Sequence, residues 1–304
     1  MYKIKFHPDG TVERYKTRIH QLNVNNAFLH GDLVEEVYMK VPPGFARPGD
    51  TRVCRLRKSI YGLRQASHNW YQKFTHALQE LQFVPSRDDH SLIVYRQGAN
   101  YVASLTYADD VILAGNDLPF IRHVKDFLHS WFTIKDLGPL KYFLDIEVAR
   151  SPQCIVLNQW KYVLDILVDS ALQATRPTAT LIEENHQLGR APLDPAPDSA
   201  TYRHLVGRLL YLTVTRPDIT YAVNVLSQAV HSPHAGAYGC CIPLSAYLKA
   251  SPSCGLFLPA SGSLIFTRYC DADWVGCPTT WRSTTGYFIT IEYVGVATGR
   301  RDVT

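Results

Sequence analysis

The sequence lacks three features that define whole classes of protein. No apolar run is long enough to cross a bilayer, and the chain opens on a charged alternating segment, not an apolar signal region. The seven cysteines are an odd number without paired spacing, which argues against a disulfide framework. No second cysteine pair completes a tetrahedral zinc site near His234. We therefore expect an intracellular protein that is not secreted, with no membrane partner and no disulfide partner.

Residues 51–79 contain no acidic side chain. Their six Lys and Arg side chains exceed the net charge of +4 of the whole chain; these are Arg52, Arg55, Arg57, Lys58, Arg64 and Lys73. A local positive field is the expected footprint of phosphate contact. The alternative is a solvated helix face, because Trp70, Phe74 and Leu78 recur at helical spacing and look like core. Both interpretations hold together if the apolar stripe packs inward and the basic side chains face out.

The order of predicted elements indicates an α+β fold. With 304 residues, 46% of them apolar, the chain can bury a sizeable core in two or three subdomains. Periodicity predicts a strand over 19–23, a helix over 63–82, a hairpin over 101–114, a helix over 118–131 and a strand over 141–149. This is the ferredoxin-like split βαβ order, which many unrelated proteins share.

Shorter signals flank this region. A Pro-Asp-Gly turn predicts a hairpin within 3–16. Two helices are predicted over 201–213 and 218–230, the second with Asp218 as an N-terminal acid or cap. Residues 264–290 alternate again and predict a small sheet that starts a new unit.

Asp109 and Asp110 are adjacent carboxylates at the tip of the predicted 101–114 hairpin. Apolar residues flank them on both sides, so the acids stand at the junction of two strands. Mg²⁺ is a hard cation that prefers carboxylate oxygens. The alternative is an ordinary solvated turn, because Asp is a common turn former. Taken alone, this stretch leaves both interpretations open.

Sequence motifs before and after this hairpin indicate a family. Before it come residues 21–31, 37–40, 42–45 and 56–66, the last ending in Tyr-Gly-Leu-Arg-Gln-Ala; after it come 136–144, 202–203, 207–212, 216–219, 271–274 and 282–287. These motifs, in this order, resemble the reverse transcriptase of copia-type retrotransposons over nearly the whole chain. The resemblance implies a truncated and degenerate copy of an RNA-directed DNA polymerase of a Pol polyprotein.

The resemblance also implies a domain organisation. We expect a right-hand polymerase with a remnant fingers hairpin at 1–18, a palm at 19–150, and a helical thumb and connection region at 151–262. A Pro-rich linker at 176–200 lies within that last region. The start of a ribonuclease H-like domain is expected at 263–304. The protein would act in the cytoplasm, the nucleus or a virus-like particle.

By resemblance, Asp109 and Asp110 are the hairpin pair of a catalytic set that holds two Mg²⁺ ions. A third acid stands in a facing strand in the family, and here that position is Asn23. An amide keeps the shape but loses the charge, so metal binding should weaken. Asp32 is close in sequence and is the alternative third ligand, although a solvated loop residue is the simpler interpretation.

The partners implied are an RNA template, a DNA primer and a deoxynucleoside triphosphate. The resemblance assigns nucleotide or template contact to Tyr61, Gly62, Arg64, Gln65 and Lys58. It places Phe28 beside the sugar pocket, where a ring can exclude a 2′-hydroxyl. The alternatives are helix-start roles for Arg64 and Gln65, and a core role for Phe28.

Several departures from the family pattern predict impaired activity. Arg18 is followed at once by Ile19, where the family has a few dozen residues that build much of the fingers. Ala108 replaces the usual Val, which is a mild change. Asp145 replaces a Gly, at a position where we expect a backbone shape that Gly adopts most easily. Asp271 resembles an opening acid of ribonuclease H, but the next acidic motif is absent and an exposed turn explains Asp271 equally well.

Three functions remain open at this point. The first is an inactive or strongly impaired polymerase domain. The second is a residual active polymerase that uses Asp109 and Asp110. The third is a catalytically dead module that still binds nucleic acid through residues 51–79.

Overall fold

The computed structural model describes residues 5–6, 12–14, 17–46, 49, 51–182, 198–259, 266–273, 284–291 and 295–296. The chain divides into two units, Met1–Leu140 and Lys141–Thr304. None of the helices in the described ranges is long and apolar enough to cross a membrane.

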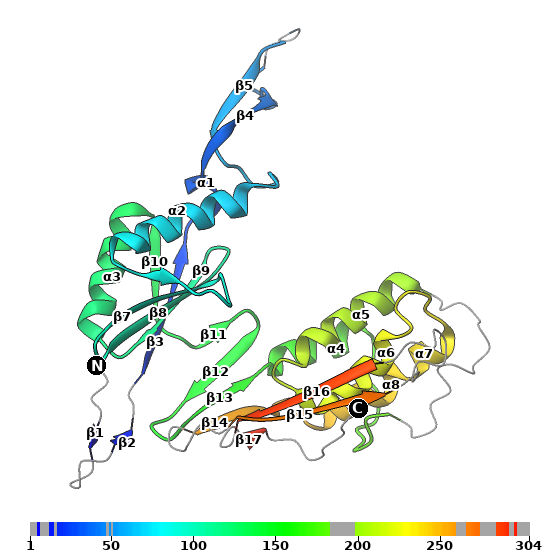
Figure 1. Cartoon of the computed structure of the whole chain (residues 1–304). Helices are drawn as coiled ribbons and strands as arrows, with labels where there is room; N and C mark the ends of the chain where they lie inside the picture. Colours follow the sequence, from blue (N-terminus) through cyan, green and yellow to red (C-terminus); the bar gives the residue numbers. More distant parts are fainter. Residues whose placement is uncertain are drawn as a thin grey trace. The chain divides into compact units, whose positions relative to one another are not determined.

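A six-stranded antiparallel sheet forms the centre of the first unit (Figure 1). Its strands, in spatial order, are β10 (Ile134–Pro139), β3 (Arg18–Val24), β9 (Asp110–Gly115), β8 (Asn100–Tyr107), β7 (Leu92–Gln97) and β6 (Val84–Pro85). Helices α2 (Ala66–Glu80) and α3 (Leu118–Trp131) cover one face of this sheet. The predicted order of strand, helix, two strands, helix and strand is therefore present.

The fourth strand of that order was wrongly located. The prediction placed it over 141–149, whereas the strand that pairs with β3 is β10. Residues 142–150 form β11 and β12 of a different sheet in the second unit. Sequence periodicity missed β10 because only Ile134 of its six residues is buried and because it ends in Gly138 and Pro139. Both residue types are depleted in strands.

The apolar stripe of α2 packs inward, as its spacing predicted. Trp70, Phe74, Ala77 and Leu78 join one core with residues of α3 and of the sheet strands. Each of these four side chains is at most 2% exposed. Burial of such side chains contributes about 1.5–3 kcal/mol each, so this stripe fixes α2 firmly against the sheet.

Lys125 ties α3 to two strands of the sheet. Its Nζ lies 2.9 and 2.8 Å from the two carboxylate oxygens of Asp136 in β10, and 3.0 Å from Nδ1 of His20 in β3. Burial raises the pKa of Asp136, but the hydrogen bonds from Lys125 and the Gly138 N–H, with the charges of Lys125 and His20, outweigh it. The pKa of Asp136 is therefore lowered, and its ionised form stabilises this junction.

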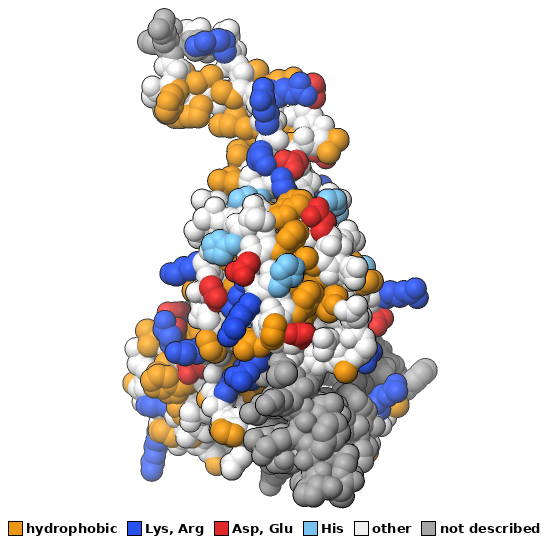
Figure 2. Space-filling model, turned by 90° about the vertical axis from the view of Figure 1, so that its left-hand side faces the viewer, with side chains coloured by type: hydrophobic (Ala, Val, Ile, Leu, Met, Phe, Trp, Pro, Cys, Tyr) orange, Lys and Arg blue, Asp and Glu red, His pale blue; other side chains and the backbone are white. Residues whose placement is uncertain are grey.

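Strands β4 (Asp32–Lys40) and β5 (Val53–Lys58) form a separate two-stranded sheet in the first unit, next to the short helix α1 (Ala27–His30). Apolar side chains gather on its surface (Figure 2), with Val34 94% and Phe45 80% exposed. The predicted N-terminal hairpin is present as β1 (Lys5–Phe6) paired with β2 (Val12–Arg14).

The second unit has a five-stranded sheet and a helical core. The strand order is β11 (Tyr142–Phe143), β12 (Ile146–Arg150), β13 (Cys154–Asn158), β14 (Gly255–Pro259) and β17 (Gly295–Val296). The helices are α4 (Trp160–Asp169), α5 (Ser199–Leu212), the 3₁₀ turn η1 (Pro217–Ile219), α6 (Thr220–Ser227), α7 (Ala235–Gly239) and α8 (Cys241–Ala250). They share one apolar core. A hairpin of β15 (Phe266–Asp273) and β16 (Thr284–Ile291) matches the predicted alternation.

The turn between β11 and β12 explains why glycine suits position 145. Phe143 pairs with Ile146, so Leu144 and Asp145 are the two central residues of a hairpin turn. Their φ angles are 48° and 60°. A type I′ turn requires φ above zero at both positions, which non-glycine residues adopt at a cost. Asp145 is compatible with the turn but strained in it.

Of the two predicted roles, Asp218 has that of an N-terminal acid, in the first turn of η1, and it does not cap α6. Its carboxylate accepts bonds from Arg216 Nη2 at 2.7 Å and from Tyr247 Oη at 2.8 Å, and the side chains of Arg216 and Asp218 are only 1% and 3% exposed. Arg216 Nη1 also donates to the Ser251 carbonyl at 2.8 Å. This buried pair links η1 to α8, and an acid in a first turn was too weak a signal to distinguish it from a cap.

The predicted division at residues 150, 262 and 263 stays a prediction. Residues 183–197 of the expected Pro-rich linker lie outside the described residues, as do the side chains of the expected ribonuclease H start other than those of 267–270. Asp271 belongs to β15, where its backbone pairs with Gly286.

Candidate active site

The register of the sheet brings three residues of the sequence prediction together. Strands β8 and β9 are joined by a two-residue turn, Ala108 and Asp109, and Asp110 is the first residue of β9. Strand β3 pairs with β9 so that Asn23 lies opposite Asp110. Asn23 Nδ2 donates to Asp109 Oδ2 at 3.2 Å, and Gln21 Nε2 donates to Asp110 Oδ1 at 3.4 Å. Asn23 and Asp109, which are 86 positions apart in the chain, thus meet where β3 ends and β9 begins.

The turn that carries the two acids is strained. Ala108 has φ of 50°, in the left-handed region. For a residue other than glycine this conformation costs about 1–2 kcal/mol and persists only where surrounding contacts hold it. Two contacts do so: the Trp70 indole N–H donates to the Ala108 carbonyl at 2.7 Å, and the Val24 N–H donates to the Asp109 carbonyl at 2.8 Å.

The donor set suits a hard cation only in part. Asp109 is exposed and Asp110 half-buried, so two carboxylates face a surface that solvent reaches. These oxygens are the ligands that Mg²⁺ prefers. Asn23 instead presents its amide N–H to Asp109 as a neutral hydrogen-bond partner. Within the described ranges, no group of three or more His, Cys, Asp or Glu side chains gathers around one point. The residues therefore fit one cation held by two carboxylates, and they lack the third carboxylate.

Asp32 does not supply the missing ligand. Its carboxylate pairs with Lys73 Nζ at 2.7 Å and with Lys58 Nζ at 3.0 Å, on β4 and away from the carboxylate pair. The Lys73 hydrogen bond is the main cause that lowers the pKa of Asp32, with Lys58 adding to it against the effect of burial. The alternative of rescue by Asp32 is therefore wrong.

The same contacts correct the picture of an uncompensated basic segment. Acids of β4, which precede the segment in sequence, pair with three of its six bases: Asp32 with Lys58 and Lys73, and Glu36 with Arg55 at 3.0 Å. Antiparallel pairing of β4 with β5 places Asp32 opposite Lys58, and Lys73 reaches Asp32 from α2. The positive field of residues 51–79 is weaker than its sequence predicted.

Of the residues predicted to contact nucleotide or template, Lys58 ends β5 and pairs with Asp32, and the others lie between β5 and α2. Phe28 lies across from them in α1. The Phe28 and Tyr61 rings are 5.1 Å apart at their centroids. Phe28 is half-buried against the core, so its core role and its ring contact coexist. Gly62 has φ of 89°, which a side chain would strain. Arg64 is exposed and Gln65 precedes α2 without a side-chain cap. Their roles stay predictions.

Sequence reasoning missed two residues that shape this site. Trp70 was assigned to the core stripe, and nothing in its spacing indicates that its N–H bonds the hairpin turn. Gly31 allows α2 to approach closely, because a Cβ there would lie 2.9 Å from Asn69 Cβ and 3.0 Å from the Trp70 backbone nitrogen. Its position after α1 was a weak signal for such packing.

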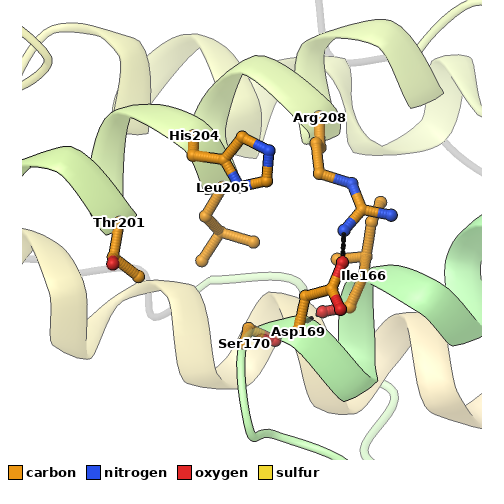
Figure 3. A pocket seen from close by; sticks show the side chains of 7 residues that line it. All are labelled: Ile166, Asp169, Ser170, Thr201, His204, Leu205 and Arg208. Atoms are coloured by element: carbon orange, nitrogen blue, oxygen red, sulfur yellow. Dashed lines mark hydrogen bonds and ion pairs between the residues drawn. The ribbon is translucent and has the colours of Figure 1, made fainter.

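A small pocket in the second unit offers no comparable chemistry (Figure 3). It lies between α4 and α5, and its lining residues are Ile166, Asp169, Ser170, Thr201, His204, Leu205 and Arg208. Arg208 pairs with Asp169, and the Ser170 hydroxyl donates to the Ile166 carbonyl at 2.7 Å. Thr201 bonds the helix cap Asp198. Arg208 and Asp169 join the two helices, whereas the bonds of Ser170 and Thr201 each lie at one end of a single helix.

Comparison with known proteins identifies the family of the chain. Residues 11–184 match the family model described as reverse transcriptase (RNA-dependent DNA polymerase). The chain is 41% identical over 272 residues to the Retrovirus-related Pol polyprotein from transposon RE2 of Arabidopsis thaliana, covering 89% of this chain and 19% of that protein. It is 32% identical over 285 residues to the one from transposon TNT 1-94 of Nicotiana tabacum, covering 90% and 21%.

A shorter relative is matched over most of its length. The putative transposon Ty5-1 protein of Saccharomyces cerevisiae is 28% identical over 269 residues, covering 88% of this chain and 87% of that protein. The chain spans about a fifth of the length of the Pol polyproteins. From the family match and these relatives, the chain belongs to the reverse transcriptase (RNA-dependent DNA polymerase) family, within the group of copia-type retrotransposon Pol polyproteins.

Proposed function

We propose that this chain is an RNA-directed DNA polymerase domain whose palm lies in the first unit and whose activity is strongly reduced or lost. One observation carries the proposal: Asn23 occupies the strand position that faces Asp109 and Asp110, and it donates a hydrogen bond to Asp109. The family match supports the polymerase assignment, and the amide accounts for the impairment.

Asp109 and Asp110 would hold Mg²⁺ in this proposal. Mg²⁺ held by these carboxylates would stabilise negative charge on a nucleoside triphosphate and make the primer 3′-hydroxyl a better nucleophile. Asn23 lacks the negative charge that a third ligand would contribute, so a second ion would have too few anionic ligands. Phosphoryl transfer depends almost entirely on positioning and on electrostatic stabilisation, so the loss of one ligand acts directly on the rate.

The remaining assignments follow the same family pattern. Lys58, Tyr61, Gly62, Arg64 and Gln65 would contact the incoming nucleotide and the template. Phe28 would lie beside the sugar. The second unit would provide the thumb and connection region and, from residue 263, the start of a ribonuclease H-like domain.

Primer extension tests the proposal. A DNA primer on an RNA template is extended with Mg²⁺ by the unmodified protein, by Asn23→Asp and by Asn23→Asp combined with Asp109→Asn. We expect little or no extension by the unmodified protein, a rise of about 10²-fold or more for Asn23→Asp, and none for the double variant. Asn224→Asp, an exposed site on α6, is the matched control for an added charge.

Two results would contradict the proposal in different ways. Equal extension by the unmodified protein and by Asn23→Asp would show that the amide is not the limiting defect. If no variant extended the primer, the domain could not polymerise even with its third carboxylate. In that case, salt-sensitive binding to template and primer would favour a nucleic-acid-binding module, because phosphate contacts release counterions.

A further inference from the structure

Two consecutive peptide units of the turn between β8 and β9 lead into Asp109 and Asp110. The carbonyl of Ala108 belongs to the unit that leads into Asp109, and the carbonyl of Asp109 belongs to the unit that leads into Asp110. The orientation of these two planes sets the direction of both acidic side chains. Because Ala108 has φ of 50°, the isolated turn would favour a different orientation.

Each of the two carbonyls is held from a different element. The Trp70 indole N–H, from α2, donates to the Ala108 carbonyl at 2.7 Å. The Val24 N–H, from the end of β3, donates to the Asp109 carbonyl at 2.8 Å. The second bond is a backbone bond that any residue at position 24 other than proline could make. The first depends on one side chain.

The Trp70 ring is itself fixed in place. It is 2% exposed, and ring centroids of Phe74, Phe132 and His30 lie 5.4, 5.1 and 6.0 Å from its own. Close packing on several sides leaves the indole one orientation, so its N–H is a preorganised donor. An indole nitrogen has no acceptor role, so its proton always points outward from the ring to the turn.

We propose that Trp70 is a positioning residue of the polymerase site, which holds Ala108 in its left-handed conformation so that Asp109 and Asp110 converge on one cation. The inference rests on the proposed function for the cation, but the holding of the turn is a property of the chain alone. Trp70 touches neither substrate nor metal in this scheme. It acts through the peptide unit between Ala108 and Asp109.

Amide exchange separates the holding of the turn from metal binding. Trp70→Phe keeps a ring in the core and removes the N–H donor, and Trp131→Phe on α3 is the matched control. We expect Trp70→Phe to raise the exchange rate of the Val24 amide about tenfold or more, because the Asp109 carbonyl that it bonds becomes mobile. Trp131→Phe should leave this amide unchanged. An unchanged rate in Trp70→Phe would overturn the inference.

Mn²⁺ binding and rescue supply the functional readout. We expect Trp70→Phe to weaken Mn²⁺ binding about tenfold, and Ala108→Gly to restore most of it, because glycine adopts positive φ without being held. Equal weakening by Trp131→Phe, or no rescue by Ala108→Gly, would indicate a merely structural role and overturn the inference. If the unmodified protein binds no Mn²⁺ while the Val24 amide responds as expected, the metal site of the proposed function fails and the holding role of Trp70 stands.

A second replacement covers the case in which Trp70→Phe does not fold. Benzothienylalanine at position 70 keeps the bicyclic shape and carries sulfur in place of the N–H. It should give the same rise in Val24 exchange. A folded protein with this replacement and an unchanged Val24 rate would overturn the inference.

Discussion

Asn23→Asp changes both the stability and the metal response of the first unit, and the structure sets the size of the change. Asn23 Nδ2 donates to Asp109 Oδ2 at 3.2 Å. The substitution removes this bond, worth about 1 kcal/mol. It also places a third negative charge near the pair, which costs about 1 kcal/mol at 4 Å in bulk water and more where solvent is excluded. We expect the free energy of unfolding of the metal-free variant to be about 2–3 kcal/mol lower than that of the parent.

Mg²⁺ should reverse this loss. A ligand that binds only the folded protein stabilises it by about 2.7 kcal/mol at roughly one hundred times its dissociation constant. Three carboxylates bind a hard dication more tightly than two carboxylates and an amide. The variant should therefore regain about 2–3 kcal/mol when Mg²⁺ is added, and the unmodified protein should gain clearly less.

The assay is urea unfolding with and without Mg²⁺ at matched ionic strength. Hydrogen exchange of the α2 and β9 amides reports the first unit alone, because both elements belong to it. Asn224→Asp in the second unit controls for the added charge. The reasoning is refuted if Asn23→Asp is as stable as the parent without metal and responds to Mg²⁺ no more than the control does.

Four further substitutions test the packing around the site and in the second unit. Arg216→Met should destabilise the second unit by about 3–5 kcal/mol in urea unfolding, because it leaves the carboxylate of Asp218 buried without its cation. Gly31→Ala should cost about 1–3 kcal/mol because its Cβ would overlap α2, while Gly207→Ala, with open space on α5, should gain about 0.5–1 kcal/mol. Asp136→Asn should cost about 0.5–1 kcal/mol at pH 7 after allowance for solvent screening, measured by urea unfolding across pH.

The pH dependence of the last substitution has a definite sign. The folded pKa of Asp136 lies below its unfolded value, so its stabilisation is present above the unfolded pKa near 4 and disappears as pH falls through the folded pKa. The difference between parent and Asp136→Asn should shrink toward zero in acid; a difference that grows in acid would contradict the assignment. If Arg216→Met left the free energy of unfolding unchanged, or if Gly31→Ala and Gly207→Ala had equal effects on it, the predictions for those substitutions would be contradicted.

Much of the fold was predictable because its signals are local. Helix α3 occupies 118–131 as predicted, since its apolar residues recur at helical spacing and Asp117 accepts a bond from the Phe120 N–H at the helix start. The β8–β9 hairpin was equally clear from two apolar strands with Asp109 and Asp110 between them. Strand β10 was missed because most of its residues are polar or are Gly and Pro, and only pairing with β3 makes it a strand.

The sequence by itself determined the family, the carboxylate pair and the loss of charge at position 23, because motif order and residue identity need no coordinates. Only the tertiary structure decided what these residues touch. Pairing of β3 with β9 brings Asn23 to Asp109, and pairing of β4 with β5 brings Lys58 to Asp32. The packing of α2 brings Lys73 to Asp32 and aims Trp70 at the turn. Such contacts join residues 26 to 86 positions apart. Strand register and helix packing set them, and local propensity carries no information about either.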